Sequence, residues 1–353
     1  MIHLIKYSFK RLIKQPSMIF WVLIFPLILS TLFKVAFSNL KEETMEDKIK
    51  VLVEDNEILK NTFLNNTYLD IDYINKNNET EINTKLLNDD YLAYLYLDNN
   101  EMKIKVSTSG IKQTIFIEIL NTNIQKYNSG KNFDDSFIIN NESSNYFNPI
   151  DSYFFSLLGM LCMFGGFYGV DIVNSTMPNL SKLGARINAS PTKKIKYFLG
   201  NTLVSYLIFL LIELIVILYM HFVLNINFGN ISSIFKLILL IMVGSIVGIT
   251  FGMVISTIKA SEAAKIGIIN AITLSLSAFA GLYATDLKYF ADTKLPFINK
   301  INPTNLINDS LLAINYFNDN SRFYSNIITL FILSIIFITM TNLILRRRKY
   351  ASI

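Results

Sequence analysis

Six long apolar runs constrain the fold of this chain more than any other feature of its sequence. Each run has roughly 20 to 28 residues, the length that a helix needs to cross about 30 Å of hydrocarbon. Only 17% of the 353 residues are charged, compared with about 25% in soluble domains. We therefore expect a polytopic membrane protein with six helical spans, at 17–37, 152–173, 196–223, 232–256, 265–285 and 325–345.

Basic residues gather at three of the polar segments that flank these spans. Cytoplasmic flanks and short loops of membrane proteins are enriched in Lys and Arg. We therefore expect the loop 174–195, the amino terminus and the tail 346–353 to be cytoplasmic, and residues 38–150 and 286–324 to be extracytoplasmic. The basic residues are Lys6, Lys10, Arg11 and Lys14 at the start, Lys182, Arg186, Lys193, Lys194 and Lys196 in the loop, and Arg346, Arg347, Arg348 and Lys349 at the end.

The first 16 residues have the pattern of a helix that lies in the headgroup plane. Apolar residues fall on one face of a helical wheel and Lys6, Lys10 and Lys14 on the other. Pro16 would end this helix. The alternative is that 1–16 is only the positive flank of the first span.

Residues 38–150 predict a small α/β domain between the first two spans. This segment has 19 acidic and 11 basic residues, a net charge of −8. Alternating apolar residues predict strands, and longer periods predict helices. The fold class is thus an all-α six-helix membrane bundle with an inserted extracytoplasmic α/β domain. We expect strands at 48–54, 68–74, 91–97 and 102–107, helices at 57–66, 79–88 and 111–127, and a linker at 132–148.

The motifs of ATP binding and of hydrolytic catalysis are missing from the sequence. It has no Gly-x-x-x-x-Gly-Lys-Ser/Thr segment, and its two histidines, His3 and His221, lie far apart. We expect no catalytic, cofactor-binding or metal-binding residues in this chain, so any ATP hydrolysis needs a separate subunit. The net charge of +5 follows from the basic flanks and does not indicate nucleic-acid binding.

Glu213 is the acidic residue placed deepest in a span, where an ionised side chain costs about 2.5 to 3.5 kcal/mol on insertion scales. It must face protein or water, either as a substrate contact or proton carrier or as a structural carboxyl that joins helices. A substrate path for apolar or amphipathic molecules is one interpretation of the soft, aromatic and polar residues of spans two and five; core packing is the other. The candidate path residues are Phe155, Met160, Met163, Phe164, Glu213, Asn270, Ser277 and Phe279.

Small residues recur at helical spacing in two spans, where they allow close helix approach. This spacing predicts helix packing, either inside the chain or across a dimer. The residues are Gly165 and Gly169 in span two and Gly244, Gly248 and Gly252 in span four.

Several local motifs follow one another in a recognisable order. Phe25-Pro26 lies in span one, and Lys50-Val-Leu-Val-Glu-Asp-Asn56 opens the inserted segment. Arg186-Ile-Asn-Ala-Ser-Pro191 is followed by Tyr197-Phe-Leu-Gly200, and Leu295-Pro-Phe-Ile-Asn-Lys-Ile-Asn-Pro303 precedes the last span. With the arrangement of spans, this order resembles ABC-2 type ABC transporter permeases over nearly the whole chain. One departure is Asn179-Leu-Ser-Lys-Leu183, where many members have an acidic Glu-x-Gly-Thr stretch.

The resemblance implies an export permease in the cytoplasmic membrane of a bacterium, for a drug, an antimicrobial peptide or a lipid-like molecule. Such a permease pairs with a second permease copy and with cytoplasmic ABC ATPase subunits, which bind ATP and Mg²⁺. The loop 174–195 would hold the coupling helix that contacts the ATPase, and membrane lipid would surround the spans. Resistance to drugs or antimicrobials would follow from export. The residues implied in coupling are Lys182, Arg186, Ser190, Pro191 and Lys193.

Two other functions are compatible with parts of the sequence. A proton-coupled secondary transporter could use Glu213 and would work without an ATPase. A membrane-anchored sensing protein could bind a ligand through the domain at 38–150 and would keep that binding on a single anchor.

Overall fold

The computed structural model describes residues 2–46, 49–57, 59–60, 69–75, 79–87, 91–98, 101–105, 149–178, 180–190, 194–317 and 319–347. The chain forms two compact units. The helical unit contains Met1–Leu32 and Asp151–Ile353, and the sheet unit contains Phe33–Ile150.

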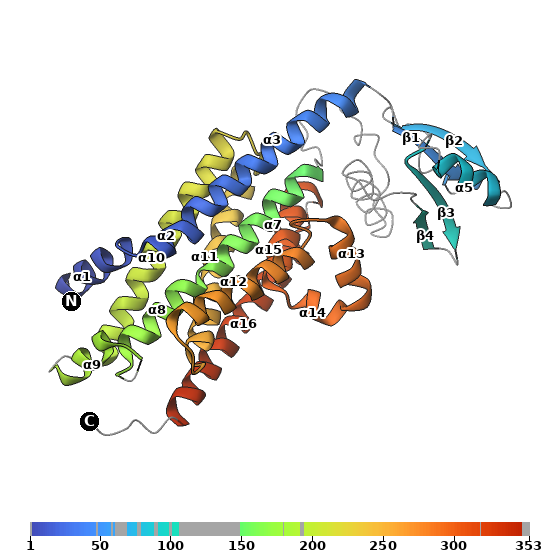
Figure 1. Ribbon diagram of the computed structural model, residues 1–353. Coiled ribbons are helices and arrows are strands. Elements are labelled where there is room, and N and C mark those ends of the chain that lie inside the picture. The colour runs from blue at the N-terminus through green and yellow to red at the C-terminus, as the bar shows by residue number, and fades with distance from the viewer. Residues whose placement is uncertain are drawn as a thin grey trace. The chain divides into compact units, whose positions relative to one another are not determined.

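Six helical segments are long and apolar enough to cross a membrane (Figure 1). They match the predicted spans to within a few residues at most boundaries. The first begins as α2 (Pro16–Ile19), passes through a π-helical turn (Phe20–Ile24) and continues as α3 (Phe25–Glu46); the second consists of α7 (Pro149–Phe164) and α8 (Gly166–Thr176). The other four are α10 (Lys194–Phe222), α11 (Ile231–Ser256), α12 (Glu262–Phe279) and α16 (Asn320–Arg347).

The second span is the core of the helical unit. All of its residues from 151 to 176 are buried, whereas α10 and α16 keep apolar faces exposed. A helix that is apolar around its whole circumference is buried against others on every side. Accordingly, α8 packs against α10, α11 and α12.

Glycines bring α11 into backbone contact with the second span. A Cβ at Gly248 would lie 1.9 Å from the carbonyl oxygen of Cys162, and one at Gly252 would lie 1.9 Å from that of Gly166. A Cβ at Gly169 would lie 2.0 Å from the oxygen of Ile249. These distances leave no room for a side chain, so the helices cross backbone to backbone within one chain.

The fifth span ends at Phe279, six residues before the predicted end. Gly281 adopts a φ of +91°, a conformation that glycine adopts without steric cost. Its N–H donates to the oxygen of Ala278 at 3.1 Å, and the N–H of Leu282 donates to the oxygen of Ser277 at 3.0 Å. These two bonds form a Schellman C-cap. Because the apolar run continues past Phe279, hydropathy alone could not predict where the helix ends.

The predicted connection 286–324 is not simply a surface segment. It folds into α13 (Thr285–Lys294), α14 (Pro296–Lys300), α15 (Pro303–Leu312) and a π-helical turn (Ala313–Phe317), and α16 already begins at Asn320. Most of α15 is buried, and it packs against α11, α12 and α16. The amide of Asn308 donates to the oxygen of Ala280 at 3.0 Å. The chain thus returns into the helical unit before its last span.

The sheet unit contains four strands in the order β2-β1-β3-β4. They are β1 (Ile49–Glu54), β2 (Leu69–Ile74), β3 (Ala93–Asp98) and β4 (Glu101–Lys105), with α5 at Glu79–Leu87. β1 pairs in parallel with β2 and β3, and β3 and β4 form an antiparallel hairpin. These strands lie within two residues of the predicted positions. The predicted helix 111–127, the linker 132–148 and most of the helix 57–66 lie outside the described residues.

Both faces of this sheet are apolar. One face buries Val51, Val53 and Leu95. The other buries Leu52 against Ile82 and Leu86 of α5. Val51, Leu52 and Val53 are consecutive apolar residues, so β1 contributes to two cores rather than to one core and a solvated face.

Candidate functional site

A short helix, α9 (Lys182–Ala189), is docked onto the end of α8. Ser181 is its N-cap, and its Oγ accepts from the N–H of Gly184 at 2.9 Å. The same hydroxyl donates to the backbone oxygen of Asn174 on α8 at 2.6 Å. A Cβ at Gly184 would lie 2.2 Å from the oxygen of Met177, so the two backbones touch. The position of α9 is thus fixed by α8.

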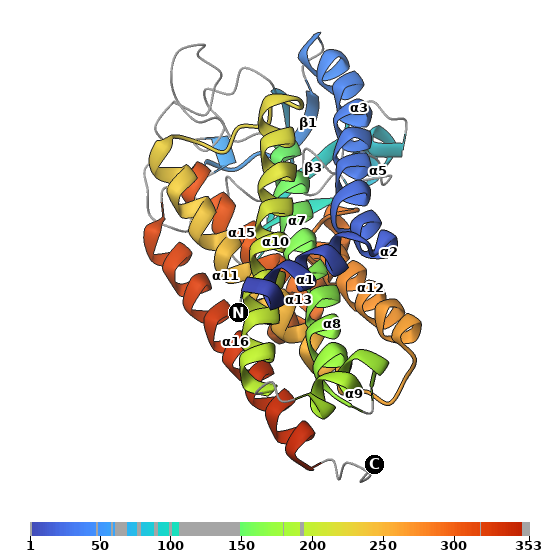
Figure 2. The same cartoon turned by 90° about the vertical axis from the view of Figure 1, so that its left-hand side faces the viewer.

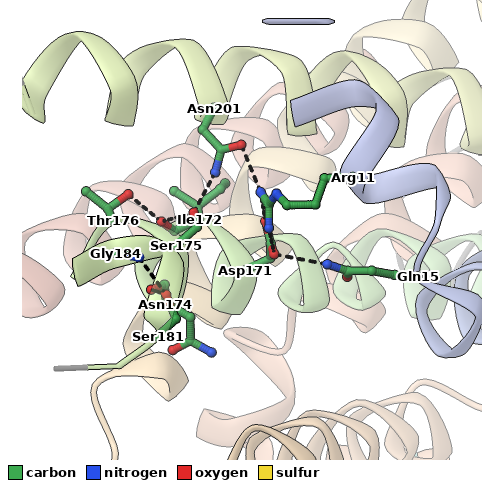
Figure 3. Close-up of polar contacts among 10 residues, drawn as sticks. All are labelled: Arg11, Gln15, Asp171, Ile172, Asn174, Ser175, Thr176, Ser181, Gly184 and Asn201. Atoms are coloured by element: carbon green, nitrogen blue, oxygen red, sulfur yellow. Dashed lines mark hydrogen bonds and ion pairs between the residues drawn. The ribbon is translucent and has the colours of Figure 1, made fainter. Parts of the chain in front are cut away.

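A buried ion pair joins the amino-terminal helix α1 (Ile2–Ile13) to α8 close to this point (Figure 3). Asp171 is only 4% exposed. Arg11 binds it in a bidentate manner, with Nη2 2.6 Å from Oδ2. Gln15 Nε2 donates to Asp171 Oδ1 at 3.2 Å. A buried carboxylate needs such partners, because ionised groups without them are costly to bury.

Arg11 stays charged in this setting. Burial by itself lowers the pKa of a guanidinium, but the hydrogen bond to Asp171 and the charge of that carboxylate outweigh burial and hold the pKa of Arg11 above its usual value. The guanidinium of Arg11 is therefore protonated at physiological pH.

The ion pair extends to α10 through an asparagine. Arg11 Nη2 donates to Asn201 Oδ1 at 3.2 Å, and Asn201 Nδ2 donates to Ser175 Oγ at 3.0 Å. Asn201 and Ser175 are both buried. One end of α10 is thus tied to α1 and to α8 at once.

The side chain of Asn174 extends the network to the fourth and fifth spans. Its Oδ1 accepts from Ser256 Oγ of α11 at 3.0 Å and from Lys265 Nζ of α12 at 3.1 Å. Lys265 is only 2% exposed. Asn174 and Ser175 are neighbours in α8, so these contacts and those of Arg11 and Asn201 meet on that helix. Together they involve six helices, and we call their residues the junction cluster: Arg11, Gln15, Asp171, Asn174, Ser175, Ser181, Asn201, Ser256 and Lys265.

Sequence reasoning missed the junction cluster. From the sequence, Asp171 is a carboxylate near a span end, where its side chain can reach water. Lys265 is the first residue of a predicted span, and Arg11 is one of several positive charges that flank the first span. The signal that could have been used is local: Asp171, Asn174 and Ser175 lie three and four residues apart, on one face of a helix that is otherwise mostly apolar.

The predicted coupling residues lie on and beside α9. Lys182 and Arg186 are exposed and four residues apart, so they share one face of the helix. Ser190 is half-buried and its Oγ donates to the oxygen of Ile187 at 2.9 Å. Pro191 and Lys193 lie outside the described residues. The structure therefore exposes two of these side chains, and their role in coupling remains a prediction.

The predicted path residues lie on three helices, α7, α10 and α12, and most of them are buried. Four of them belong to α7 and are fully buried among neighbouring helices, namely Phe155, Met160, Met163 and Phe164. Ser277 is also buried and donates to the oxygen of Thr273 at 2.8 Å, whereas Asn270 and Phe279 are half-buried on α12. These side chains fill space between helices in this conformation, and their role in transport remains a prediction.

Glu213 has no exposed surface, and its carboxylate contacts the hydroxyl of Ser245 on α11. Ser245 Oγ also lies 2.6 Å from the carbonyl oxygen of Ile241. Glu213 therefore connects α10 to α11 at the level where the small residues of α11 pack.

No curated protein and no solved structure matches this chain. A family model described as ABC-2 family transporter protein matches residues 16–343. This match includes the sheet unit, α9, the first five candidate spans and the sixth up to residue 343. The chain therefore belongs to the ABC-2 transporter family, the membrane components of ABC transporters.

Proposed function

We propose that this protein is the permease subunit of an ATP-driven exporter that moves a hydrophobic or amphipathic molecule out of a bacterial cell. The observation that carries the proposal is α9, an exposed basic helix held by hydrogen bonds at the end of the central span. A partner that binds and moves α9 therefore also moves the second span, to which α9 is bonded. Family membership supports the transport role.

In this proposal, a separate ABC ATPase binds ATP and Mg²⁺ and moves α9 when its subunits close. Because Ser181 is bonded to the backbone of α8, displacement of α9 moves the end of the second span. The junction cluster then distributes that movement, through Arg11 to α1 and through Asn201 to α10. Packed, hydrogen-bonded elements move together as rigid bodies, which is how a local shift becomes a change of span arrangement.

The positive flanks orient the molecule in this proposal. α9 and both termini lie in the cytoplasm, and the sheet unit is an extracytoplasmic domain. Two permease copies, identical or different, form the path, to which Glu213 and the aromatic and Met side chains of α7 and α12 contribute. The cargo is a drug, an antimicrobial peptide or a lipid-like molecule, so export confers resistance.

Affinity purification of the full chain from its native membrane tests the proposal. We expect a subunit with a Gly-x-x-x-x-Gly-Lys-Ser/Thr segment to copurify and to hydrolyse ATP faster in the complex. Arg186→Glu should weaken this association about tenfold, because it places a negative charge at the contact. The matched control is Lys294→Glu, which reverses an exposed charge on α13.

Two outcomes would contradict the proposal. One is an Arg186→Glu variant with wild-type ATPase binding and transport. The other is transport by the purified permease in vesicles with a proton gradient and no ATPase, which would instead favour a secondary transporter that uses Glu213.

A further inference from the structure

The structure contains a half-open groove beside the bend between α1 and α2, which consists of Lys14 and Gln15 and which we call the elbow. The volume of the groove is about 250 Å³, slightly below the usual range for ligand pockets. The elbow, α8 and α12 form its walls, and Figure 2 shows the elbow and α12 on the same side of the helical unit. None of the predicted path residues lines this groove.

The walls of the groove are apolar and its rim carries two opposite charges. Met18 of α2, Phe167 of α8 and Ile266 of α12 supply apolar surface. Lys14 and Glu262 are exposed lining residues. In the part of the chain that the structure describes, no ion pair or hydrogen bond occupies either charge. The groove is thus open to a ligand with its own positive and negative groups.

The place of the groove in the chain determines which ligand can reach it. It begins at Lys14, at the end of an amphipathic helix of the kind that lies among lipid headgroups. It continues past Met18 into the first span, where acyl chains are the surrounding medium. A ligand in the groove therefore has its charged part at the headgroup level and its apolar part in the hydrocarbon.

We propose that this groove binds one membrane phospholipid with a zwitterionic, primary-amine headgroup of the phosphatidylethanolamine class. The lipid phosphate pairs with Lys14, its ammonium group pairs with Glu262, and an acyl chain lies against Met18, Phe167 and Ile266. Phosphatidylcholine has the same charges, but its quaternary ammonium cannot donate a hydrogen bond to a carboxylate. Phosphatidylglycerol carries only the negative charge and leaves Glu262 unpaired.

The single tryptophan of the chain provides the readout. Trp21 follows Met18 by three residues and packs against Phe25 and Phe164. Lipids with brominated acyl chains quench tryptophan fluorescence on contact. The full-length permease is placed in vesicles of phosphatidylcholine that contain a minor fraction of brominated phosphatidylethanolamine, phosphatidylcholine or phosphatidylglycerol, and the quenching of Trp21 is compared.

We expect brominated phosphatidylethanolamine to occupy the site about fivefold better than the other two lipids, a ratio that corresponds to ~1 kcal/mol. Against phosphatidylcholine this is the size of one net hydrogen bond to Glu262, and against phosphatidylglycerol it is the size of one headgroup charge near the surface. Lys14→Gln and Glu262→Gln should each remove this preference. Lys196→Gln, which neutralises an exposed lysine of α10 outside the groove, is the matched control and should keep it. Unchanged emission of Trp21 without brominated lipid shows that the variants are folded.

Equal quenching by all three lipids, or a preference that survives both groove variants, overturns the proposal. A preference for phosphatidylglycerol also overturns it, because it shows that Lys14 acts without Glu262. If no brominated lipid quenches Trp21, protein covers the groove, and this result also overturns the proposal. The measurement needs no ATPase, so the lipid proposal can be rejected without rejecting the proposed export function.

Discussion

At the scale of single residues, Asp171 is an example of a buried ion-pair partner that cannot be predicted from the sequence of a membrane protein. A carboxylate near the end of a span reads as a group that reaches water. The structure instead buries it and pairs it with Arg11, 160 positions away in the sequence. Neither residue type nor spacing could indicate such a partner. The basic character of α9 could be predicted from charge, whereas the contacts of the junction cluster could not.

Removal of one partner of this pair should be more damaging than removal of both charges. Asp171→Asn leaves the guanidinium of Arg11 without its counter-ion, and loss of one partner from a fully buried pair costs roughly 3 to 5 kcal/mol. Because Arg11 is partly exposed, we expect a loss of about 2 kcal/mol in the free energy of unfolding. Thermal unfolding in detergent measures it.

The control for this experiment is the double variant Arg11→Gln with Asp171→Asn, which retains hydrogen-bonding groups without charge. It should recover part of the lost stability, since the two changes act on one contact. Strictly additive losses in the single and double variants would show that the pair is not coupled.

Glu213 should tolerate an isosteric amide but not an apolar side chain. Ser245 has one hydroxyl proton and two neighbouring oxygen acceptors, on Glu213 and Ile241. A side chain at position 213 that can itself donate fits this contact, so Glu213→Gln should leave the unfolding temperature nearly unchanged. Glu213→Leu removes this polar contact between α10 and α11, leaves Ser245 only the carbonyl oxygen of Ile241, and should cost about 1 to 3 kcal/mol.

Transport by the same variants separates the structural role from a functional one. A structural carboxyl predicts that Glu213→Gln transports as well as the wild type at each pH. A Gln variant that inserts and unfolds normally but does not transport would instead place Glu213 in the substrate path.

At the scale of elements, the sequence was most informative where one physical pattern dominates. The pattern of apolar residues located β1, β2, β3 and β4, because a strand with one buried face alternates and a strand buried on both faces is a short apolar run. Hydropathy located the six span helices but misplaced the end of α12. Gly281 and Leu282 are compatible with an apolar run, and only the backbone turn at Gly281 ends the helix. α15 was missed because its asparagines and prolines suggest an exposed connection.

The crossing of α11 with the second span should be sensitive to a single methyl group. At Gly248, a Cβ would lie 1.9 Å from the oxygen of Cys162, so Gly248→Ala must push the helices apart. Overpacking of this kind costs about 1 to 3 kcal/mol. Gly267→Ala on α12 is the matched control, because nothing lies within 4 Å of its Cβ position. Equal thermal stability of both variants would argue against this crossing.

At the scale of the whole molecule, the proposed orientation depends on charge alone. In the proposal, the basic flanks indicate that α9 and both termini are cytoplasmic and that the sheet unit is extracytoplasmic. The junction cluster lies at the end of the spans that carries α9, so the orientation decides whether the cluster can transmit movement from a cytoplasmic ATPase. An ATPase can use the cluster only if that end faces the cytoplasm.

Labelling of single cysteines in intact cells should therefore divide the molecule into two sides. Cys162 is buried and is replaced by Ala in the background. Thr84→Cys in α5 and Thr293→Cys in α13 should react with an impermeant thiol reagent from outside, because both positions are exposed and belong to the predicted outer segments. Ala189→Cys in α9 and Ala263→Cys in α12 are equally exposed, but should react only after the membrane is permeabilised. Labelling of position 189 in intact cells would invert the orientation, and a cytoplasmic ATPase could then no longer reach α9.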